Sequence, residues 1–240
     1  MIISGTRGWI LLLVISAIAS GIPPRAAGAG EYEAFHGPDL YRAKGLYRAG
    51  DREAGAAILR PLLADPDWRV RTYALGAIAE IRGRELLPEV HRALMDPSFE
   101  VREAASRLLQ QIGDASSRAP LRQALRDPIA IVRSNAAEAL VRVAAEEDFA
   151  VLEILLQSDP DPSVRALTAG ALGQAEGAFA VPLLLLAVRD TDPVVRMHAA
   201  EALGARGEAG VRPILNVLAS EDPDSRVRLS AQQALARIPE

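Results

Sequence analysis

The sequence predicts an all-α protein in which helical hairpins stack on one another along a single axis. Three observations predict it. A short motif returns six times at a nearly constant interval, apolar residues follow each copy at the spacing of a helix face, and a second apolar segment follows the first. A period of about 30 residues is typical of repeat architectures, in which each unit buries its apolar face only by stacking on its neighbours.

The repeated motif is Asp-Pro, three further residues and then Val-Arg. Successive copies begin 31, 31, 32, 31 and 32 residues apart, and in the fifth copy Thr191 stands where the others have proline. The copies begin at Asp65, Asp96, Asp127, Asp159, Asp190 and Asp222. The array therefore divides into six repeats, the last of them truncated: 65–95, 96–126, 127–158, 159–189, 190–221 and 222–240.

Each motif carries signals that start a helix. Aspartate is a favoured N-cap because its carboxylate accepts hydrogen bonds from free N–H groups of the first turn, and proline suits the first helical position. After the valine, small or apolar residues follow at +4, +7 and +8; after Val132 these are Ala136, Ala139 and Leu140. This spacing is one face of an α-helix, and the small +4 residues predict that neighbouring helices approach closely.

A second, shorter helix is expected in each unit. Its clearest instances are 119–125, 181–188 and 211–218, each with a proline near its start and an apolar stripe behind it. Short polar or glycine-containing segments join the two helices. Ahead of the array, residues 38–64 lack the motif and are expected to form a capping hairpin, because terminal repeats are usually atypical.

The pattern D-P-x-x-x-V-R-x-x-A-A-x-A-L resembles the HEAT repeat, in the short variant named after phycobilisome lyases, over about residues 65–240. The resemblance implies a right-handed α-solenoid with the first helices on its convex side and the second helices on its concave side. It also implies that the motif aspartates pair with arginines of adjacent repeats as a structural ladder; the weaker alternative is a row of arginines that binds anions. The arginines concerned are Arg71, Arg102, Arg133, Arg165, Arg196 and Arg228.

The amino-acid composition argues against several classes of function. The formal net charge of −4 does not favour a nucleic-acid partner, which normally meets a basic face. The absence of cysteine excludes disulfides, thiol catalysis and cysteine-ligated zinc. The three histidines, His36, His91 and His198, form no metal-binding motif, and neither a P-loop nor a nucleophile elbow occurs. We therefore expect no catalytic site, no cofactor and no metal, and hence no enzyme.

Residues 1–19 read as a secretory signal peptide, and 20–37 as a flexible leader. Arg7 precedes the apolar run 9–19, which ends in the small-x-small pattern Ala17-Ile18-Ala19. The run is shorter than the roughly 20 residues that span a bilayer. The sequence thus predicts a periplasmic or secreted protein with no stable membrane insertion after cleavage; the alternative is an N-terminal membrane anchor.

If the second helices line the concave side, three residue positions on each second helix point outward from the stack. Aligned on Leu121 to Leu125, these positions are polar and basic in the first two repeats and apolar in the later ones. The partner-binding residues predicted in this way are His91, Arg92, Arg122, Arg126, Ile154, Leu184, Leu185, Val188 and Leu215. A contiguous exposed apolar patch usually marks an interaction site. The alternative is that these leucines are buried, because the array curves tightly or the alignment is off by one residue.

These features favour a non-catalytic protein–protein interaction scaffold of the bacterial envelope that binds a protein or peptide partner on its concave helix face. The resemblance offers an alternative, a bilin-lyase-like or chaperone-like factor that acts on a chromophore or a client protein. The export signal argues against bilin attachment. The sequence defines neither the partner nor the oligomeric state.

Overall fold

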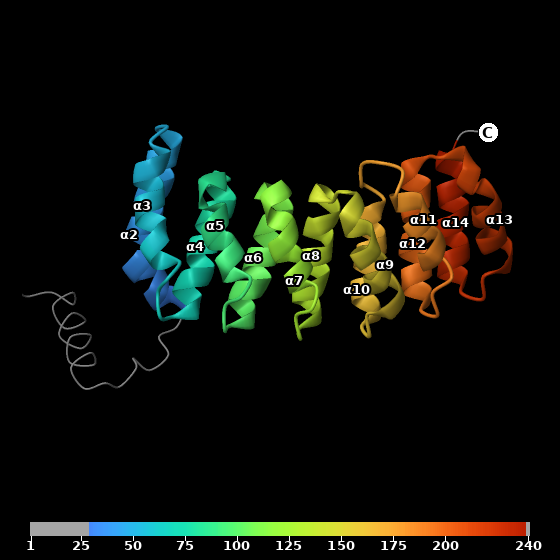
Figure 1. The fold of residues 1–240 in the computed structure, drawn as a ribbon, viewed down its shortest axis with the longest axis horizontal. Coiled ribbons are helices and arrows are strands. Elements are labelled where there is room, and N and C mark those ends of the chain that lie inside the picture. The colour runs from blue at the N-terminus through green and yellow to red at the C-terminus, as the bar shows by residue number, and fades with distance from the viewer. Residues whose placement is uncertain (1–28, 239–240) are drawn as a thin grey trace, which may run out of the picture.

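The structure, a computed structural model, describes residues 29–238, with side chains described from residue 37 onward. The helices stand side by side in chain order and form an α-solenoid, as the repeat period predicts (Figure 1). The predicted signal peptide and the leader up to residue 28 lie outside the described residues. The leader is corrected over 29–37, because helix α2 (Ala29–Arg48) already begins there and pairs with α3 (Arg52–Leu62) as the N-terminal hairpin.

Each repeat contributes a long first helix that carries the Val-Arg pair. These first helices are α4 (Trp68–Ile81), α6 (Phe99–Ile112), α8 (Ala130–Val143), α10 (Pro162–Leu172), α12 (Pro193–Arg206) and α14 (Ser225–Arg237). The second helices are α5 (Leu87–Ala93), α7 (Arg118–Ala124), α9 (Phe149–Ser158), α11 (Ala180–Ala187) and α13 (Arg212–Glu221). Short 3₁₀ turns precede four of the second helices: η1 (Arg84–Leu86), η2 (Ala115–Ser117), η3 (Glu146–Asp148) and η4 (Ala209–Val211).

The motif aspartate does not cap the helix that follows it. In the first repeat the carboxylate of Asp65 accepts a hydrogen bond from the backbone N–H of Asp67, at 2.8 Å, and Asp67 is the N-cap of α4. The same two-residue offset recurs in the fifth repeat, where Asp192 is the N-cap of α12 and Asp190 precedes it. The predicted capping role is thus wrong for the motif aspartate, since its carboxylate holds the turn before the helix instead.

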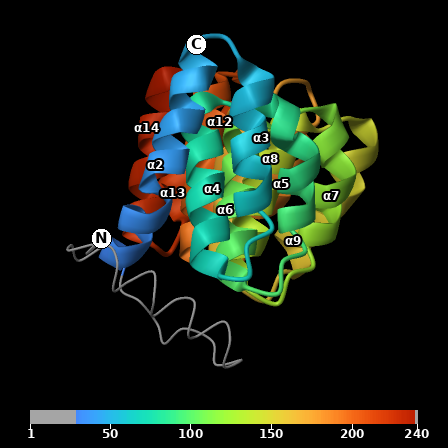
Figure 2. The same ribbon diagram turned by 90° about the vertical axis from the view of Figure 1, so that its left-hand side faces the viewer.

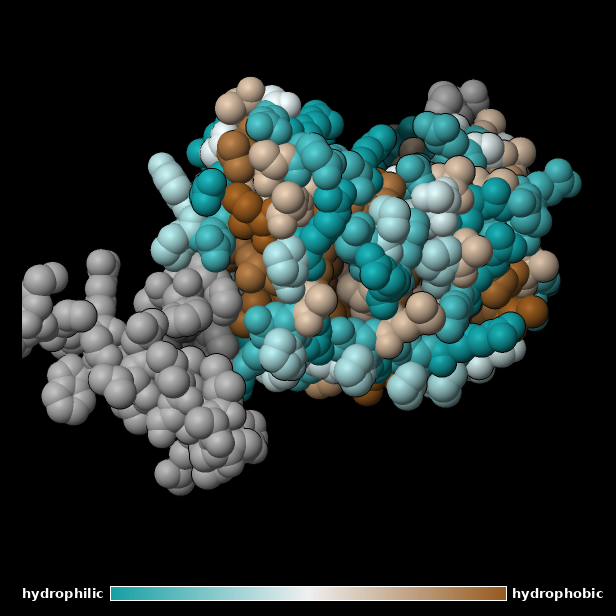
Figure 3. Space-filling view, turned by 60° about the vertical axis from the view of Figure 1, so that its left-hand side comes forward, coloured by the Kyte–Doolittle hydropathy of each residue, from teal (hydrophilic) through white to brown (hydrophobic). Residues whose placement is uncertain are grey.

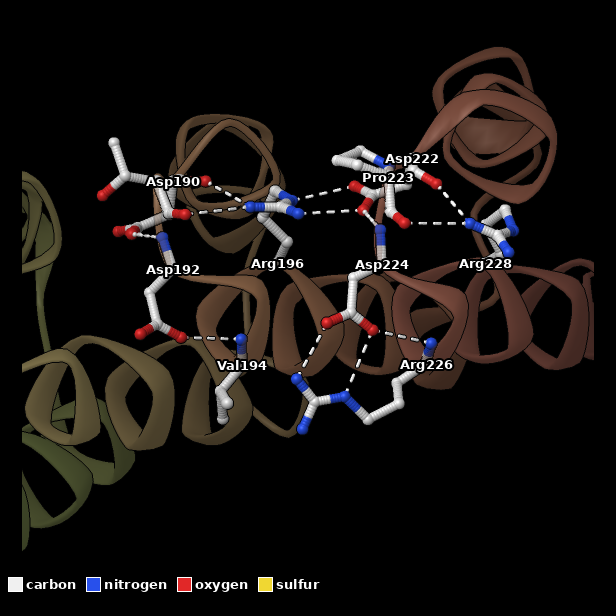
Figure 4. Close-up of polar contacts among 10 residues, drawn as sticks. Asp190, Asp192, Val194, Arg196, Asp222, Pro223, Asp224, Arg226 and Arg228 are labelled. Atoms are coloured by element: carbon white, nitrogen blue, oxygen red, sulfur yellow. Dashed lines mark hydrogen bonds and ion pairs between the residues drawn. The ribbon is translucent and has the colours of Figure 1, made fainter.

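The carboxylates of Asp96, Asp127, Asp159, Asp190 and Asp222 form the predicted ladder. A motif arginine donates from Nε and Nη2 to both carboxylate oxygens of the aspartate one repeat later, over N···O distances of 2.6–3.1 Å. Its Nη1 donates to the backbone carbonyl of its own motif aspartate (Figure 4). The pairs are Arg71–Asp96, Arg102–Asp127, Arg133–Asp159, Arg165–Asp190 and Arg196–Asp222. Such bidentate, partly buried pairs fix geometry as well as charge.

The first helices pack directly on one another and form what we call the inner row. Their +4 side chains are fully buried, as predicted: Ala74, Ala105, Ala136, Thr168, Ala199 and Ala231. Helix backbones come so close that a Cβ on Gly204 would lie 2.6 Å from Cα of Ala234, and one on Gly173 would lie 2.9 Å from Cα of Ala202.

The second helices form the outer row, and most of them make few contacts with the second helices of adjacent repeats. Figure 2, which looks along the array, shows α3, α5 and α7 on one side and α2, α4 and α6 on the other. In a curved stack the more closely spaced row lies on the inside. The first helices therefore line the concave side, and the opposite assignment implied by the family resemblance is wrong.

Candidate functional site

The predicted partner-binding residues all lie on the outer row, and the structure groups only some of them. His91, Arg92 and Arg126 line one groove between α5 and α7. Arg122 turns away from them, since its Nε lies 3.2 Å from the buried carboxylate of Asp148. The basic half predicted from the sequence is therefore a surface of three residues.

The predicted apolar half is mostly buried. Leu184 and Leu215 are 0% exposed and Val188 is 3% exposed, whereas Ile154 and Leu185 are 63% and 36% exposed. The face in Figure 3 is likewise mainly hydrophilic, with hydrophobic residues in narrow strips. The buried alternative is thus correct for Leu184, Leu215 and Val188, and these three residues cannot contact a partner.

The cause is a slip of one residue in the alignment. A constant step of 31 from His91 reaches Leu184 and Leu215, but the 32-residue repeat 127–158 places its extra residue after its buried leucine. The true equivalents of Leu121 are the fully buried leucines Leu152, Leu184 and Leu215. Leu184 therefore fills the core position, and Leu185 takes the outward position of Arg122.

The inner row contains a cavity that the sequence analysis did not predict. It has a volume of about 400 Å³ and opens on the concave side across α6, α8 and α10. Its apolar wall comes from Val141, Leu167 and Ala171, and its polar groups come from Gln110, Glu138, Arg142, Gln174 and Glu176. A cavity of this size, mainly preformed and with a few polar groups, is typical of a small ligand or a single side chain.

Glu138 is the central polar group of this cavity. It lies six residues after Val132, and the same position of the next repeat is Gly170, where a Cβ would lie 3.2 Å from Nδ1 of His198. No hydrogen bond or ion pair joins the carboxylate of Glu138 to any residue within 37–238. Burial raises the pKa of Glu138, because the carboxylate loses part of the water that stabilises its charged form.

The other polar groups of the cavity have distinct roles. Gln110 Nε2 donates to the backbone carbonyl of Asn135 at 3.3 Å, which fixes the amide against α8. Arg142, Gln174 and Glu176 are exposed at the rim. The cavity thus combines a half-buried carboxylate, amides that can bind a peptide backbone, and aliphatic walls.

Metal-binding residues are not grouped anywhere in the described part of the chain. Within it, no three His, Cys, Asp or Glu side chains lie close enough together to hold a metal ion. His91 Nε2 is 2.8 Å from Ser117 Oγ, and burial lowers the pKa of His91. Between residues 29 and 238 no helix has the length and apolarity needed to cross a membrane.

The family model of the HEAT repeats matches residues 56–141, 93–166 and 149–236, which together run over most of the chain. Among curated proteins, deoxyhypusine hydroxylase of Arabidopsis thaliana is 42% identical over 87 residues, which are 35% of this chain and 28% of that protein. Deoxyhypusine hydroxylase of Saccharomyces cerevisiae is 35% identical over 98 residues, which are 39% of this chain and 30% of that protein. The chain thus matches less than a third of the length of either relative.

Two solved structures share the fold. A HEAT-like repeat protein of the archaeon Thermococcus onnurineus aligns with a TM-score of 0.55 at 14% identity, over 89% of this chain and 97% of that one. The complex of CpcE and CpcF of phycocyanin lyase from Nostoc aligns with a TM-score of 0.51 at 20% identity, over 62% of this chain and 98% of that one. At these identities the likeness shows the α-solenoid fold alone.

The relatives correct the expected function. The sequence favoured a non-catalytic scaffold and no enzyme, but both curated relatives are enzymes. That expectation is therefore wrong, and the bilin-lyase-like or chaperone-like alternative explains the relatives no better.

Proposed function

The chain belongs to the HEAT repeat family, and we propose that its concave side binds an amine-bearing side chain of a polypeptide, the substrate-binding part of a hydroxylase-like activity. The observation that carries the proposal is the half-buried carboxylate of Glu138, which has no partner in the described chain. Stability does not explain it, because an uncompensated buried carboxylate costs folding free energy.

A cationic amine matches the cavity in charge and in shape. Its ammonium group donates to Glu138 and supplies the missing positive charge, while its methylene groups lie against Val141, Leu167 and Ala171. The amides of Gln110 and Gln174 bond the backbone that carries the amine. Hydrogen bonds to a charged group contribute about 1.5–3 kcal/mol, so Glu138 alone is worth roughly ten- to hundredfold in affinity.

The oxidising half of a hydroxylase activity is not assigned to these residues. Oxygen insertion into a C–H bond uses a redox-active group, and a non-haem iron site takes two histidines and a carboxylate on one face. The cavity presents two carboxylates, two amides and an arginine, and no histidine. This set of side chains does not fit such a site, so the residues described here are assigned only the binding and orientation of the substrate.

The test measures binding to the full chain by isothermal titration calorimetry. The probes are two nine-residue alanine- and serine-based peptides that differ only at the centre, one with lysine and one with norleucine. We expect the lysine peptide to bind at least tenfold more tightly, and Glu138→Gln to remove that difference. Glu201→Gln is the matched control, since Glu201 has the equivalent position on α12 and accepts a hydrogen bond from Ser230. Equal affinity for the two peptides, or an equal loss in both variants, would refute the proposal.

A further inference from the structure

The groove between α5 and α7, on the convex side, is a second candidate binding surface and is independent of the Glu138 cavity. It has a volume of about 940 Å³. We infer that this groove binds a short acidic peptide segment of another protein that also carries one aliphatic side chain.

The charge of the groove points to an acidic ligand. Its two aspartates, Asp96 and Asp127, are already paired in the ladder, so they offer no free negative charge. Arg126 is exposed, and its side chain forms no hydrogen bond or ion pair with any described residue. Arg92 has a side chain that is 71% exposed, and its contact to Glu89 is long, at 3.5 Å. Two arginines therefore remain available in a protein whose net charge is −4.

The groove also offers an apolar contact. Met95 is 61% exposed within it, beside Pro120 and Ala124. Methionine is unbranched and polarizable, so it adapts to aliphatic or aromatic side chains of different shapes. Gln123 is exposed along the same side and can bond a peptide backbone. An aliphatic residue flanked by carboxylates satisfies these groups together.

The equivalent groove between α9 and α11 is too narrow to bind such a peptide, and it serves as a comparison. There Leu156 and Leu186 fill the space, and the remaining volume is about 350 Å³. Phe149 stacks on Phe179 with ring centroids 3.8 Å apart and ties the start of α9 to the segment before α11. Arg189 lies in this groove and is exposed, which provides an arginine at a related position without the wide groove.

A nucleic acid is the less favoured ligand for the same arginines. Its binding depends on the neutralisation of many phosphates, and affinity falls with salt in proportion to their number. Two exposed arginines on an acidic chain match two or three carboxylates better than a phosphate backbone.

The test uses fluorescence anisotropy with a labelled twelve-residue Asp/Glu peptide that has a central leucine. We expect the double variant Arg92→Glu, Arg126→Glu to weaken binding at least twentyfold and Met95→Ser to weaken it several-fold. Arg189→Glu should change it less than twofold. Tighter binding of a labelled twelve-residue single-stranded oligonucleotide, an equal effect of Arg189→Glu, or no binding to the wild-type chain would overturn the inference.

Glu138→Gln separates the two proposals. It should leave the acidic peptide's affinity unchanged while it removes the preference for the lysine peptide. Failure of one site therefore leaves the result for the other intact.

Discussion

In the inner row, every pair of neighbouring repeats is joined by the same Arg–Asp contact and by small residues that let the helix backbones touch. In the outer row, α9 and α11 pack on each other, whereas α5 and α7 leave a wide groove between them. Each repeat contributes one helix to each row, and the rows differ in how closely neighbouring helices are spaced. Only small side chains fit between the closely spaced helices of the inner row. The wider spacing of the outer row accepts side chains of different sizes from one repeat to the next.

One position of the closely packed first helices varies from repeat to repeat. At the position six residues after the motif valine, the repeats carry Gly76, Arg107, Glu138, Gly170, Glu201 and Gln233. Glu138 and Gly170 line the concave cavity, and none of the six residues takes part in the ladder. Function can therefore vary along this line without disturbing the stack, which is why a cavity with a half-buried carboxylate occurs there.

Breaking one rung should have the largest effect. In the Arg133–Asp159 pair the side chains are 11% and 2% exposed, and the N···O distances are 2.8 Å. Arg133→Ala leaves the carboxylate of Asp159 buried without a compensating cation, and only the backbone N–H of Asp161 still donates to it, so we expect the free energy of unfolding to fall by about 3–5 kcal/mol. Urea denaturation followed by circular dichroism measures it.

Arg142→Ala is the matched control for this rung, because Arg142 is exposed on the same helix, α8. It should change the free energy of unfolding by less than about 0.5 kcal/mol. Equal losses in the two variants would mean that the rung contributes no more than a surface arginine.

The outer row is tested at two adjacent leucines. Leu184 is fully buried and Leu185 is 36% exposed. Leu184→Ala should cost about 2–5 kcal/mol, from lost burial and the cavity that remains. Leu185→Ala should cost about 1 kcal/mol, less than Leu184→Ala, since 36% of the Leu185 surface already meets water whereas none of the Leu184 surface does. Thermal denaturation of both variants at one protein concentration gives the comparison, and the reverse order would restore the alignment in which Leu184 faces outward.

Sequence reasoning predicted the parts of the fold that repeat with the motif. The helices, the buried +4 positions and the ladder all lie at fixed distances from Val-Arg, so one copy predicts the rest. The outer row is less predictable, because the 32-residue repeat 127–158 adds its extra residue after Leu152 and shifts every later position by one. Which row lies inside depends on the relative spacing of the rows, which no single repeat specifies.

The candidate cavity was beyond the sequence for a related reason. Glu138 occupies a polar position of an amphipathic helix, and nothing in α8 alone distinguishes it from an exposed glutamate such as Glu201. Its burial depends on the neighbouring helices α6 and α10, which supply the other walls of the cavity. A glutamate followed by glycine at the equivalent position of the next repeat is the signal that could have indicated it, since Gly170 follows Glu138 whereas Gln233 follows Glu201.

The smallest expected effect is a change in the free energy of unfolding when the charge of Glu138 is removed. Burial raises the pKa of Glu138, so its ionised form is less stable in the folded chain than in the unfolded chain. Glu138→Gln keeps the shape and removes the charge, so the variant should be more stable than the wild type at pH 8, by less than about 1 kcal/mol. As the pH falls through the raised pKa, the folded wild type takes up a proton before the unfolded chain does, and the advantage of the variant should shrink. Glu201→Gln removes an exposed carboxylate, so it should show no such gain at pH 8, and unfolding curves between pH 4.5 and pH 8 compare Glu138→Gln with the wild type. A destabilised Glu138→Gln variant at pH 8 would mean that the carboxylate stabilises the fold, and the argument that it is kept for a ligand would fail.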